Sequence, residues 1–137
     1  MIQEDKELLL KDLCARLPYG VKLQKTYDTS DPIELYLVDL GHDIIKFYTY
    51  KGEGLTMCDV GNIERFGKLR YKPYLFPLSS MTVGQGQEFA ATLKYLPAEE
   101  IDFWTLNTFD WCNKNHFDYR NLIGKGLAID ATGLNIY

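Results

Sequence analysis

Residues 109–120, FDWCNKNHFDYR, bring a thiol, an imidazole and two carboxylates into one aromatic stretch. Cys112 and His116 are four positions apart, so on a helix their side chains would be neighbours. Such a pair could form a catalytic nucleophile and its base, or half of a metal site. A catalytic thiolate, however, needs an exposed electropositive pocket and an orienting third group, and a zinc site needs three or four ligands. A small enzyme that uses Cys112 and His116 is therefore the weaker alternative, and we expect neither a metal nor a cofactor.

The same stretch is also typical of the end of a packed helix. On a helix from about 97 to 115, one face would carry Ile101, Trp104, Thr108, Trp111 and Cys112. This spacing predicts that Cys112 is buried beside both tryptophans, where an apolar environment raises the pKa of a thiol and makes it inert. We interpret Asp110 as a solvated residue and Asp118 as a turn or cap residue.

A second group of candidate residues lies in ERFGKLRYKPY, residues 64–74, where cations alternate with aromatic rings. This composition suits single-stranded nucleic acid or phosphate, because cations contact the backbone and rings stack on bases. The predicted binding residues are Arg65, Lys68, Arg70, Tyr71, Lys72 and Tyr74, together with the ring of Phe66. The same alternation is typical of a strand with one wet face, and charged edges deter strand addition by other chains. The net charge of −4 also disfavours nucleic acid as a partner.

The glycine pairs do not match a nucleotide-binding motif. Around Gly124-Lys125-Gly126, a P-loop would need glycine at the position of Tyr119 and Ser or Thr at that of Gly126. The sequence also has no G-x-S-x-G, H-E-x-x-H or EF-hand pattern. These observations favour a protein without catalytic activity.

Composition predicts one globular domain over residues 1–137, with 46% apolar and 25% charged residues. The three cysteines, Cys14, Cys58 and Cys112, form no C-x-x-C, which favours free thiols in a reducing compartment. The first residues have no apolar signal core, and no stretch approaches the roughly 20 apolar residues of a membrane span. We therefore expect a cytoplasmic protein without a membrane partner.

Hydrophobic periodicity predicts the elements that must position these residues. Residues 3–20 read as a helix with an apolar face of Ile2, Leu9, Leu10, Leu13, Cys14 and Leu17, from which Leu8 is excluded. Alternating patterns predict strands at 21–27, 33–40, 44–50, 55–60 and 65–75. A helix that Pro97 ends, a second helix from about 97 to 115, and a turn or short helix at 119–125 follow.

The predicted fold class is α+β. An N-terminal helix leads into an antiparallel meander of four or five strands, for which a small SH3-like barrel is one possible form, and two C-terminal helices pack on it. Short connections between the strands favour antiparallel neighbours.

Three segments, KDLCARLPYGVK, KPYLFPLSSMT and FDWCNKNHFDYRNLIGKGLA, resemble a group of short uncharacterised proteins of gut Bacteroidetes and of their phages and prophages. The resemblance covers most of the chain at these three anchor points and implies a bacterial or phage cytoplasmic origin, but no activity. In the group an acidic helix start follows SSMT, whereas Val83-Gly84-Gln85-Gly86 stands here, which predicts a later helix start.

Our leading hypothesis is a non-catalytic protein-binding or adaptor module, an accessory protein of a mobile element. Its protein partner would contact a tyrosine-rich sheet surface, with Tyr36, Tyr48, Tyr50, Tyr71 and Tyr74 as candidates. The alternative is a nucleic-acid or phosphate binder that uses residues 65–74.

Overall fold

The structure is a computed structural model that describes residues 3–26, 31–41, 44–51, 54–56, 64–65 and 68–137; side chains between 35 and 67 lie outside this description. Its α-helices are α1 (Gln3–Arg16), α2 (Val83–Thr92) and α3 (Leu106–Lys114), with 3-10 turns at Leu17–Tyr19 and Leu78–Ser80. The strands of the main sheet are β1 (Lys22–Lys25), β2 (Ile33–Gly41), β3 (Ile44–Lys51), β4 (Gly54–Thr56), β7 (Tyr71–Pro77), β10 (Phe117–Asp118) and β11 (Ile129–Asp130). Two separate pairs are formed by β5 (Glu64–Arg65) with β6 (Lys68–Leu69), and by β8 (Lys94–Leu96) with β9 (Ile101–Phe103). The α+β class is therefore confirmed.

Helix α1 forms where the sequence predicts it, but it buries a different face. Leu9 and Leu13 are buried as expected, whereas Cys14 is exposed and Leu8 packs against the core. The buried face is thus turned by one residue, about 100° around the helix axis. This rotation about the helix axis buries Asp12 and Arg16, which form an ion pair.

The main sheet contains the predicted antiparallel meander from β1 to β4, and then departs from it. Strand β7 pairs with β1 in antiparallel fashion, while β10 and β11 both run parallel to β7. The described strands form an open path in the order β10-β7-β1-β2-β3-β4, so the SH3-like barrel is not confirmed. The strand predicted at 65–75 is divided among β5, β6 and β7, and residues 57–60 of the strand predicted at 55–60 lie outside the description.

The prediction of one helix from about 97 to 115 is wrong in its first half. Strands β8 and β9 form a hairpin there, with Leu96 opposite Ile101. Pro97 disfavours helical backbone at the residue before it, and Glu100 takes a left-handed φ of 52° in the turn. Helix α3 begins only after Thr105, whose side chain accepts a hydrogen bond from the backbone N–H of Thr108 in a capping box.

Helix α2 begins at Val83, so the later start predicted from the glycines is also wrong. Thr82 accepts a hydrogen bond from the backbone N–H of Gln85, and the Gln85 side chain accepts one from the backbone N–H of Thr82. This reciprocal capping box fixes the helix start and outweighs the low helix propensity of two glycines.

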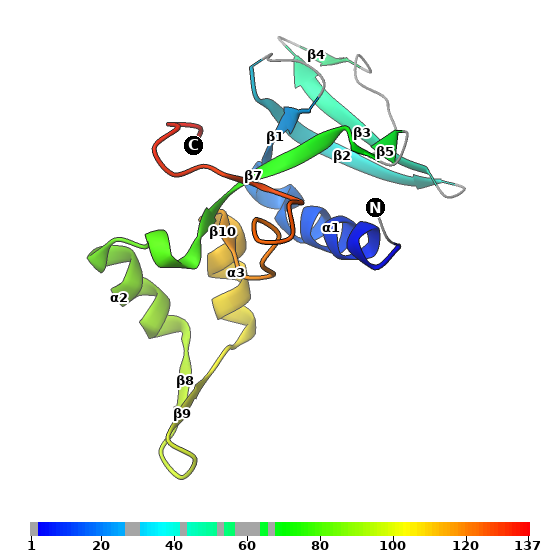
Figure 1. The fold of residues 1–137 in the computed structure, drawn as a ribbon. Coiled ribbons are helices and arrows are strands. Elements are labelled where there is room, and N and C mark those ends of the chain that lie inside the picture. The colour runs from blue at the N-terminus through cyan, green and yellow to red at the C-terminus, as the bar shows by residue number, and fades with distance from the viewer. Residues whose placement is uncertain (1–2, 27–30, 42–43, 52–53, 57–63, 66–67) are drawn as a thin grey trace.

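The core lies where α1, β1, β7 and the segment after β10 meet. It consists of Leu9, Leu13, Val21, Leu23, Tyr71, Leu75, Leu122, Leu127 and Ala128. In Figure 1, α2, the β8–β9 hairpin and α3 extend away from this body, and the hairpin lies at the far end. We call residues 83–114, which comprise these elements, the arm.

Candidate functional site

Two of the tyrosines predicted to bind, Tyr71 and Tyr74, are core residues. Tyr71 is 1% and Tyr74 is 7% exposed, and both lie on β7, which has paired strands on both sides. The hydroxyl of Tyr74 donates a hydrogen bond to the Gln24 side chain, and the hydroxyl of Tyr137 donates one to the Tyr74 carbonyl at 2.8 Å. The first hydrogen bond holds the Tyr74 side chain, and because both rings are buried, neither lies on a surface on which bases could stack.

Two of the four predicted basic residues lie at one groove. Lys68 is exposed and Lys72 is half-buried, and both line a groove beside β6 and β7. The guanidinium carbon of Arg70 lies 5.7 Å from the centre of the Tyr71 ring, over its face. The side chain of Arg65, on β5, and the residue Phe66 lie outside the description, as do the side chains of Tyr36, Tyr48 and Tyr50.

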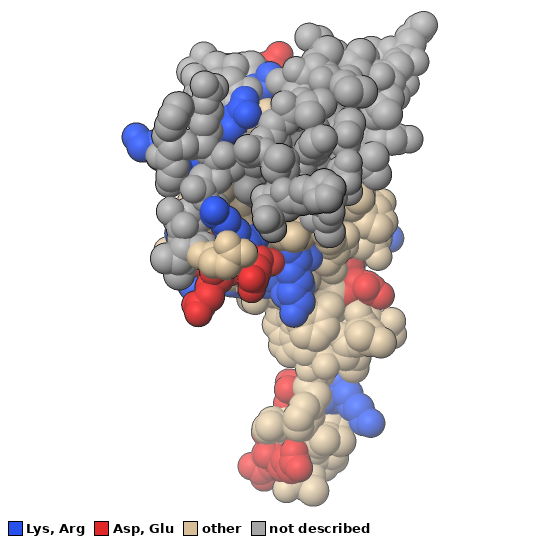
Figure 2. Space-filling model, turned by 90° about the vertical axis from the view of Figure 1, so that its right-hand side faces the viewer, with Lys and Arg blue, Asp and Glu red and all other residues tan. Residues whose placement is uncertain are grey.

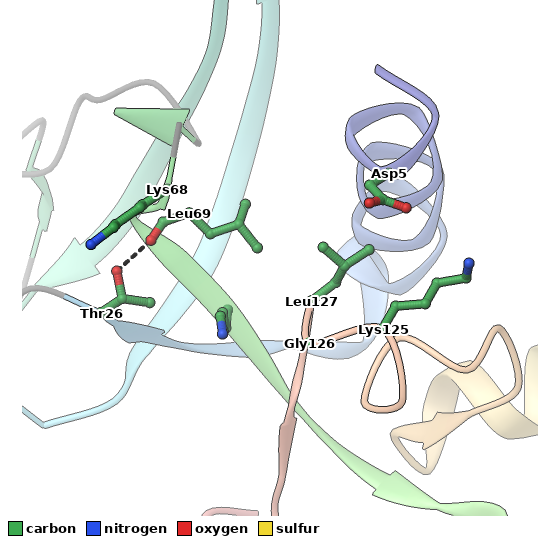
Figure 3. Close-up of a pocket in the computed structure, with 8 residues that line it drawn as sticks. Asp5, Thr26, Lys68, Leu69, Lys125, Gly126 and Leu127 are labelled. Carbon is green, nitrogen blue, oxygen red and sulfur yellow. Dashed lines mark hydrogen bonds between the residues drawn. The ribbon is translucent and has the colours of Figure 1, made fainter. Parts of the chain in front are cut away.

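The groove between α1, β6–β7 and the loop after β10 is the pocket of interest among the described residues, with a volume of about 460 Å³. We call it the lysine groove, because Lys68, Lys72 and Lys125 all line it, opposed by the single carboxylate of Asp5. Figure 3 shows Leu69 and Leu127 facing one another across it, while the side chains of Lys68 and Lys125 extend in opposite directions. The groove therefore has apolar walls between cations.

Asp118 positions the loop that brings Lys125 to this groove. Its two carboxylate oxygens accept hydrogen bonds from the backbone N–H groups of Leu122 and Ile123, both at 2.9 Å. The predicted turn-capping role of Asp118 is thus confirmed. Gly126 then takes a left-handed φ of 74°, which a glycine adopts at little cost, and Leu127 returns to the core. Lys125 was not among the predicted binding residues, because its only sequence signal was a failed P-loop match.

A second surface of interest is the arm, which exposes apolar side chains. Seven of the ten large hydrophobic side chains that are exposed among the described residues belong to it. Leu106 and Val83 are 83% and 81% exposed, and Tyr95, Ile101 and Phe103 are exposed on the hairpin. In Figure 2 the arm is mainly uncharged, with acidic residues gathered toward its tip.

Threonine side chains join the two ends of the arm's helices. The Thr105 hydroxyl donates a hydrogen bond to the Thr92 carbonyl at 2.8 Å, and the hydroxyl of the fully buried Thr108 donates one to the same carbonyl at 3.0 Å. The end of α2 is thereby tied to the start of α3. Since both helices also begin in capping boxes, the base of the hairpin is held in one arrangement.

Aromatic contacts connect the arm to the body. The Trp104 ring lies 5.3 Å from that of Phe89 and 5.2 Å from that of Phe109, measured between ring centres. Trp111 stacks on Phe117 of β10 at 5.3 Å, and Phe89 lies 5.7 Å from Trp111. Trp111 is therefore half-buried and Trp104 is exposed, and both pack against neighbouring aromatic rings. The prediction that both tryptophans lie in the core beside Cys112 is wrong.

Cys112 itself is buried as predicted, with 0% exposure. Burial raises the pKa of its thiol to about 11, against a smaller lowering by the charge of Arg16. Burial and the charges of Arg16 and Lys22 lower the pKa of His116 to about 4. Both groups are therefore neutral near pH 7, whereas a thiolate–imidazolium pair would need the opposite shifts. Burial and the directions of these two pKa shifts therefore give no support to a nucleophile at Cys112.

His116 has a structural position at the end of α3. Its φ of 63° is left-handed, and its ring stacks on that of Tyr137, with 3.6 Å between the ring centres and 10° between the planes. The Tyr137 hydroxyl accepts a hydrogen bond from the backbone N–H of Lys22 at 2.9 Å. The stacked pair therefore ties the C-terminal residue to the start of β1.

No protein-family model, curated protein or solved structure matches this chain. Within the part of the chain that the structure describes, no helix is both long and apolar enough to cross a membrane. Over the same residues, no three His, Cys, Asp or Glu side chains are grouped in a way that could hold a metal ion.

Proposed function

We propose that this chain is a non-catalytic protein-binding module that contacts its partner through the arm. The supporting observation is the concentration of exposed apolar side chains there, above all Val83 and Leu106. Exposed apolar surface is unfavourable in water, and a contiguous patch of it commonly marks a protein interface. The arm replaces the tyrosine-rich sheet as the proposed surface, because Tyr71 and Tyr74 are buried.

The arm is also stiff enough to bind without a large ordering cost. The threonine hydrogen bonds and the ring contacts of Trp104 hold its helices before a partner arrives. Side-chain and loop ordering otherwise reduces affinity, so a pre-formed surface binds more tightly for the same contacts. Aromatic side chains such as Trp104 and Tyr95 are the types that most often dominate interface energies.

The charge of the arm defines the chemistry of its partner. Glu99, Glu100 and Asp102 are exposed at the hairpin, with Lys94 as the only cation on its strands. We propose a partner surface that is apolar at its centre and basic at its rim, because opposite charges steer association and fix register. On the sequence resemblance, we place this module in the bacterial cytoplasm as an accessory protein of a mobile element.

Nucleic-acid or phosphate binding is the second candidate, supported by the three lysines of the lysine groove. It ranks lower because the tyrosine rings that would stack on bases are buried, and because the net charge is −4. Asp5 further reduces the positive charge of the groove.

The test is affinity capture from the native host with the wild-type chain and with Val83→Asp/Leu106→Asp. A protein recovered in stoichiometric amount with the wild type should be lost with the double variant. Titration with that purified partner should then show at least a tenfold weaker Kd, because two charges must be desolvated at the interface.

Leu134→Asp is the matched control, since Leu134 is 51% exposed but lies outside the arm. It should retain the partner at wild-type affinity. Equal capture by the arm variant and the wild type would refute the proposal, as would equal loss with Leu134→Asp.

A further inference from the structure

We infer that the partner surface for the arm is the lysine groove of a second copy of this chain, so that the hairpin tip of one molecule docks between β6–β7 and α1 of the next. This inference rests on the proposed protein-binding role of the arm. It assigns a ligand to the lysine groove, an acidic polypeptide segment with an apolar residue at its centre.

The lining of the groove places apolar side chains between separated positive charges. Leu69 and Leu127 face one another across it and are the apolar part of its wall. Lys68 and Lys125 extend away from each other, so their ammonium groups do not converge on a single small anion. A ligand with separated negative charges and an apolar group between them satisfies both features.

The hairpin tip of this chain carries that pattern. In Glu100-Ile101-Asp102 an apolar residue stands between two acidic residues in the sequence, and all three residues are exposed. Ile101 is 43% exposed although it is a large aliphatic residue, so it would gain by burial against Leu69 and Leu127. Glu99 adds a third exposed carboxylate beside them.

The charges of the two surfaces are complementary. Three lysines against Asp5 leave the groove positive, whereas three carboxylates against Lys94 leave the tip negative. Attraction between them is strongest at low ionic strength, because salt screens charges that are exposed to solvent. The association should therefore weaken as salt is added.

The contact must form between two molecules. Figure 1 places the hairpin at the end of the arm, well away from the first turn of α1, which contributes Asp5 to the groove. A tip from one copy and a groove from another make a head-to-tail interface, which forms rings or open chains according to the rotation between copies.

Charge reversal on each side tests this inference. The groove variant is Lys68→Glu/Lys125→Glu and the tip variant is Glu100→Lys/Asp102→Lys; all four side chains are exposed, so both variants should fold. Sedimentation velocity from about 5 to about 200 µM protein in about 50 mM salt, where the screening length exceeds ~10 Å, measures the assembly. Circular dichroism and the unfolding midpoint check that each variant is folded.

The wild type should form larger species as its concentration rises, and these should shrink in about 0.5 M salt, where the screening length is only a few ångströms. Each variant alone should remain a monomer, because it meets like charges at the interface. An equimolar mixture should associate again, since the acidic tip of the groove variant fits the basic groove of the tip variant. Recovery in the mixture is the result that a general loss of structure or solubility could not produce.

Two outcomes would overturn the inference: a wild type that stays monomeric throughout, or an assembly that both charge-reversed variants form unchanged. Salt-sensitive binding of a single-stranded DNA oligonucleotide that displaces the assembly and is lost in the groove variant would also overturn it, in favour of a nucleic-acid site. A monomeric wild type that still captures a host protein through Val83 and Leu106 would refute this inference but leave the proposed function intact.

Discussion

Asp12 and Arg16 form a fully buried ion pair one turn apart on α1, with 2.7 Å between the Asp12 carboxylate and Arg16 Nε and 0% exposure of both side chains. Arg16 Nη2 also donates a hydrogen bond to the carbonyl of Phe117 at 2.7 Å, and Arg120 donates one to Asp12 at 3.2 Å. Residues that are distant in sequence therefore meet at this pair, and it links α1 to β10 and to the loop of the lysine groove.

Asp12→Asn should strongly destabilise the fold, because it leaves the Arg16 charge buried without its counterion. The expected loss is about 3–5 kcal/mol of unfolding free energy, measured by urea denaturation near pH 7. Arg120→Gln is the control: its side chain is 19% exposed and its bond to Asp12 is longer, so the loss should be much smaller. Replacing the pair together, Asp12→Leu/Arg16→Met, should recover much of the stability. A loss below about 1 kcal/mol in Asp12→Asn would contradict the role of the pair.

Cys112→Ser should lower the unfolding free energy by about 1–3 kcal/mol, because it places a hydroxyl in a buried apolar site. Cys14→Ser, at the exposed thiol of α1, should change it by no more than about 0.5 kcal/mol. In the native protein a thiol reagent should modify Cys14 quickly, and Cys112 only after unfolding, as mapped by peptide mass spectrometry. Rapid native labelling of Cys112 would show that its site opens to solvent.

Lowering the pH should destabilise the fold through protonation of His116. The pKa of His116 is lowered to about 4 in the folded chain from an ordinary value of 6.5, so the unfolded chain takes up the proton first. The contribution of neutral His116 to the unfolding free energy is therefore complete above pH 6.5, and it is lost as the pH falls from 6.5 through 4. Between pH 7 and pH 4 the wild type should lose about 1–3 kcal/mol more than His116→Phe, which keeps an aromatic ring against Tyr137 but cannot be protonated. Parallel pH profiles for the two proteins would argue against a neutral, half-buried imidazole.

The chain should not bind single-stranded DNA or RNA measurably at micromolar protein and physiological salt. Its net charge of −4 opposes encounter with polyanions, and the rings of Tyr71 and Tyr74 are buried. Fluorescence anisotropy of a labelled oligonucleotide over a salt series measures this. A complex that weakens steeply with salt and disappears in Lys68→Ala/Lys72→Ala/Lys125→Ala would make nucleic-acid binding the leading function, because each phosphate contact releases counterions.

Local pattern determined much of the architecture. The alternation in residues 21–27, 33–40 and 44–50 predicted β1, β2 and β3, and helical periodicity over residues 3–20 predicted α1 and the 3-10 turn that follows it. The burial of Cys112 and the capping role of Asp118 were also predictable, because a small thiol in an aromatic stretch and an Asp before a turn have strong local preferences.

Tertiary contacts decided what the spacing could not. The periodicity of 97–115 matched a helix, but pairing of β8 with β9 and the cap at Thr105 made a hairpin instead. The buried face of α1 depends on Asp12 and Arg16, and their four-residue spacing is visible in the sequence. Their burial, however, requires hydrogen-bond partners from the other end of the chain, which are the carbonyl of Phe117 and the side chain of Arg120.

The candidate binding residues were likewise predicted in part from the sequence and decided in part by the tertiary structure. Sequence identified Lys68 and Lys72 as possible ligand contacts, since cations on an alternating strand have one exposed face. It could not add Lys125 to them or remove Tyr71 and Tyr74, because those outcomes depend on the loop after β10 and on the strands that cover β7. The sequence by itself thus determined most of the helical and extended segments, through period and turn residues, but not the β8–β9 hairpin. Only the tertiary structure decided which side chains meet and which remain exposed, because burial depends on what packs against each face.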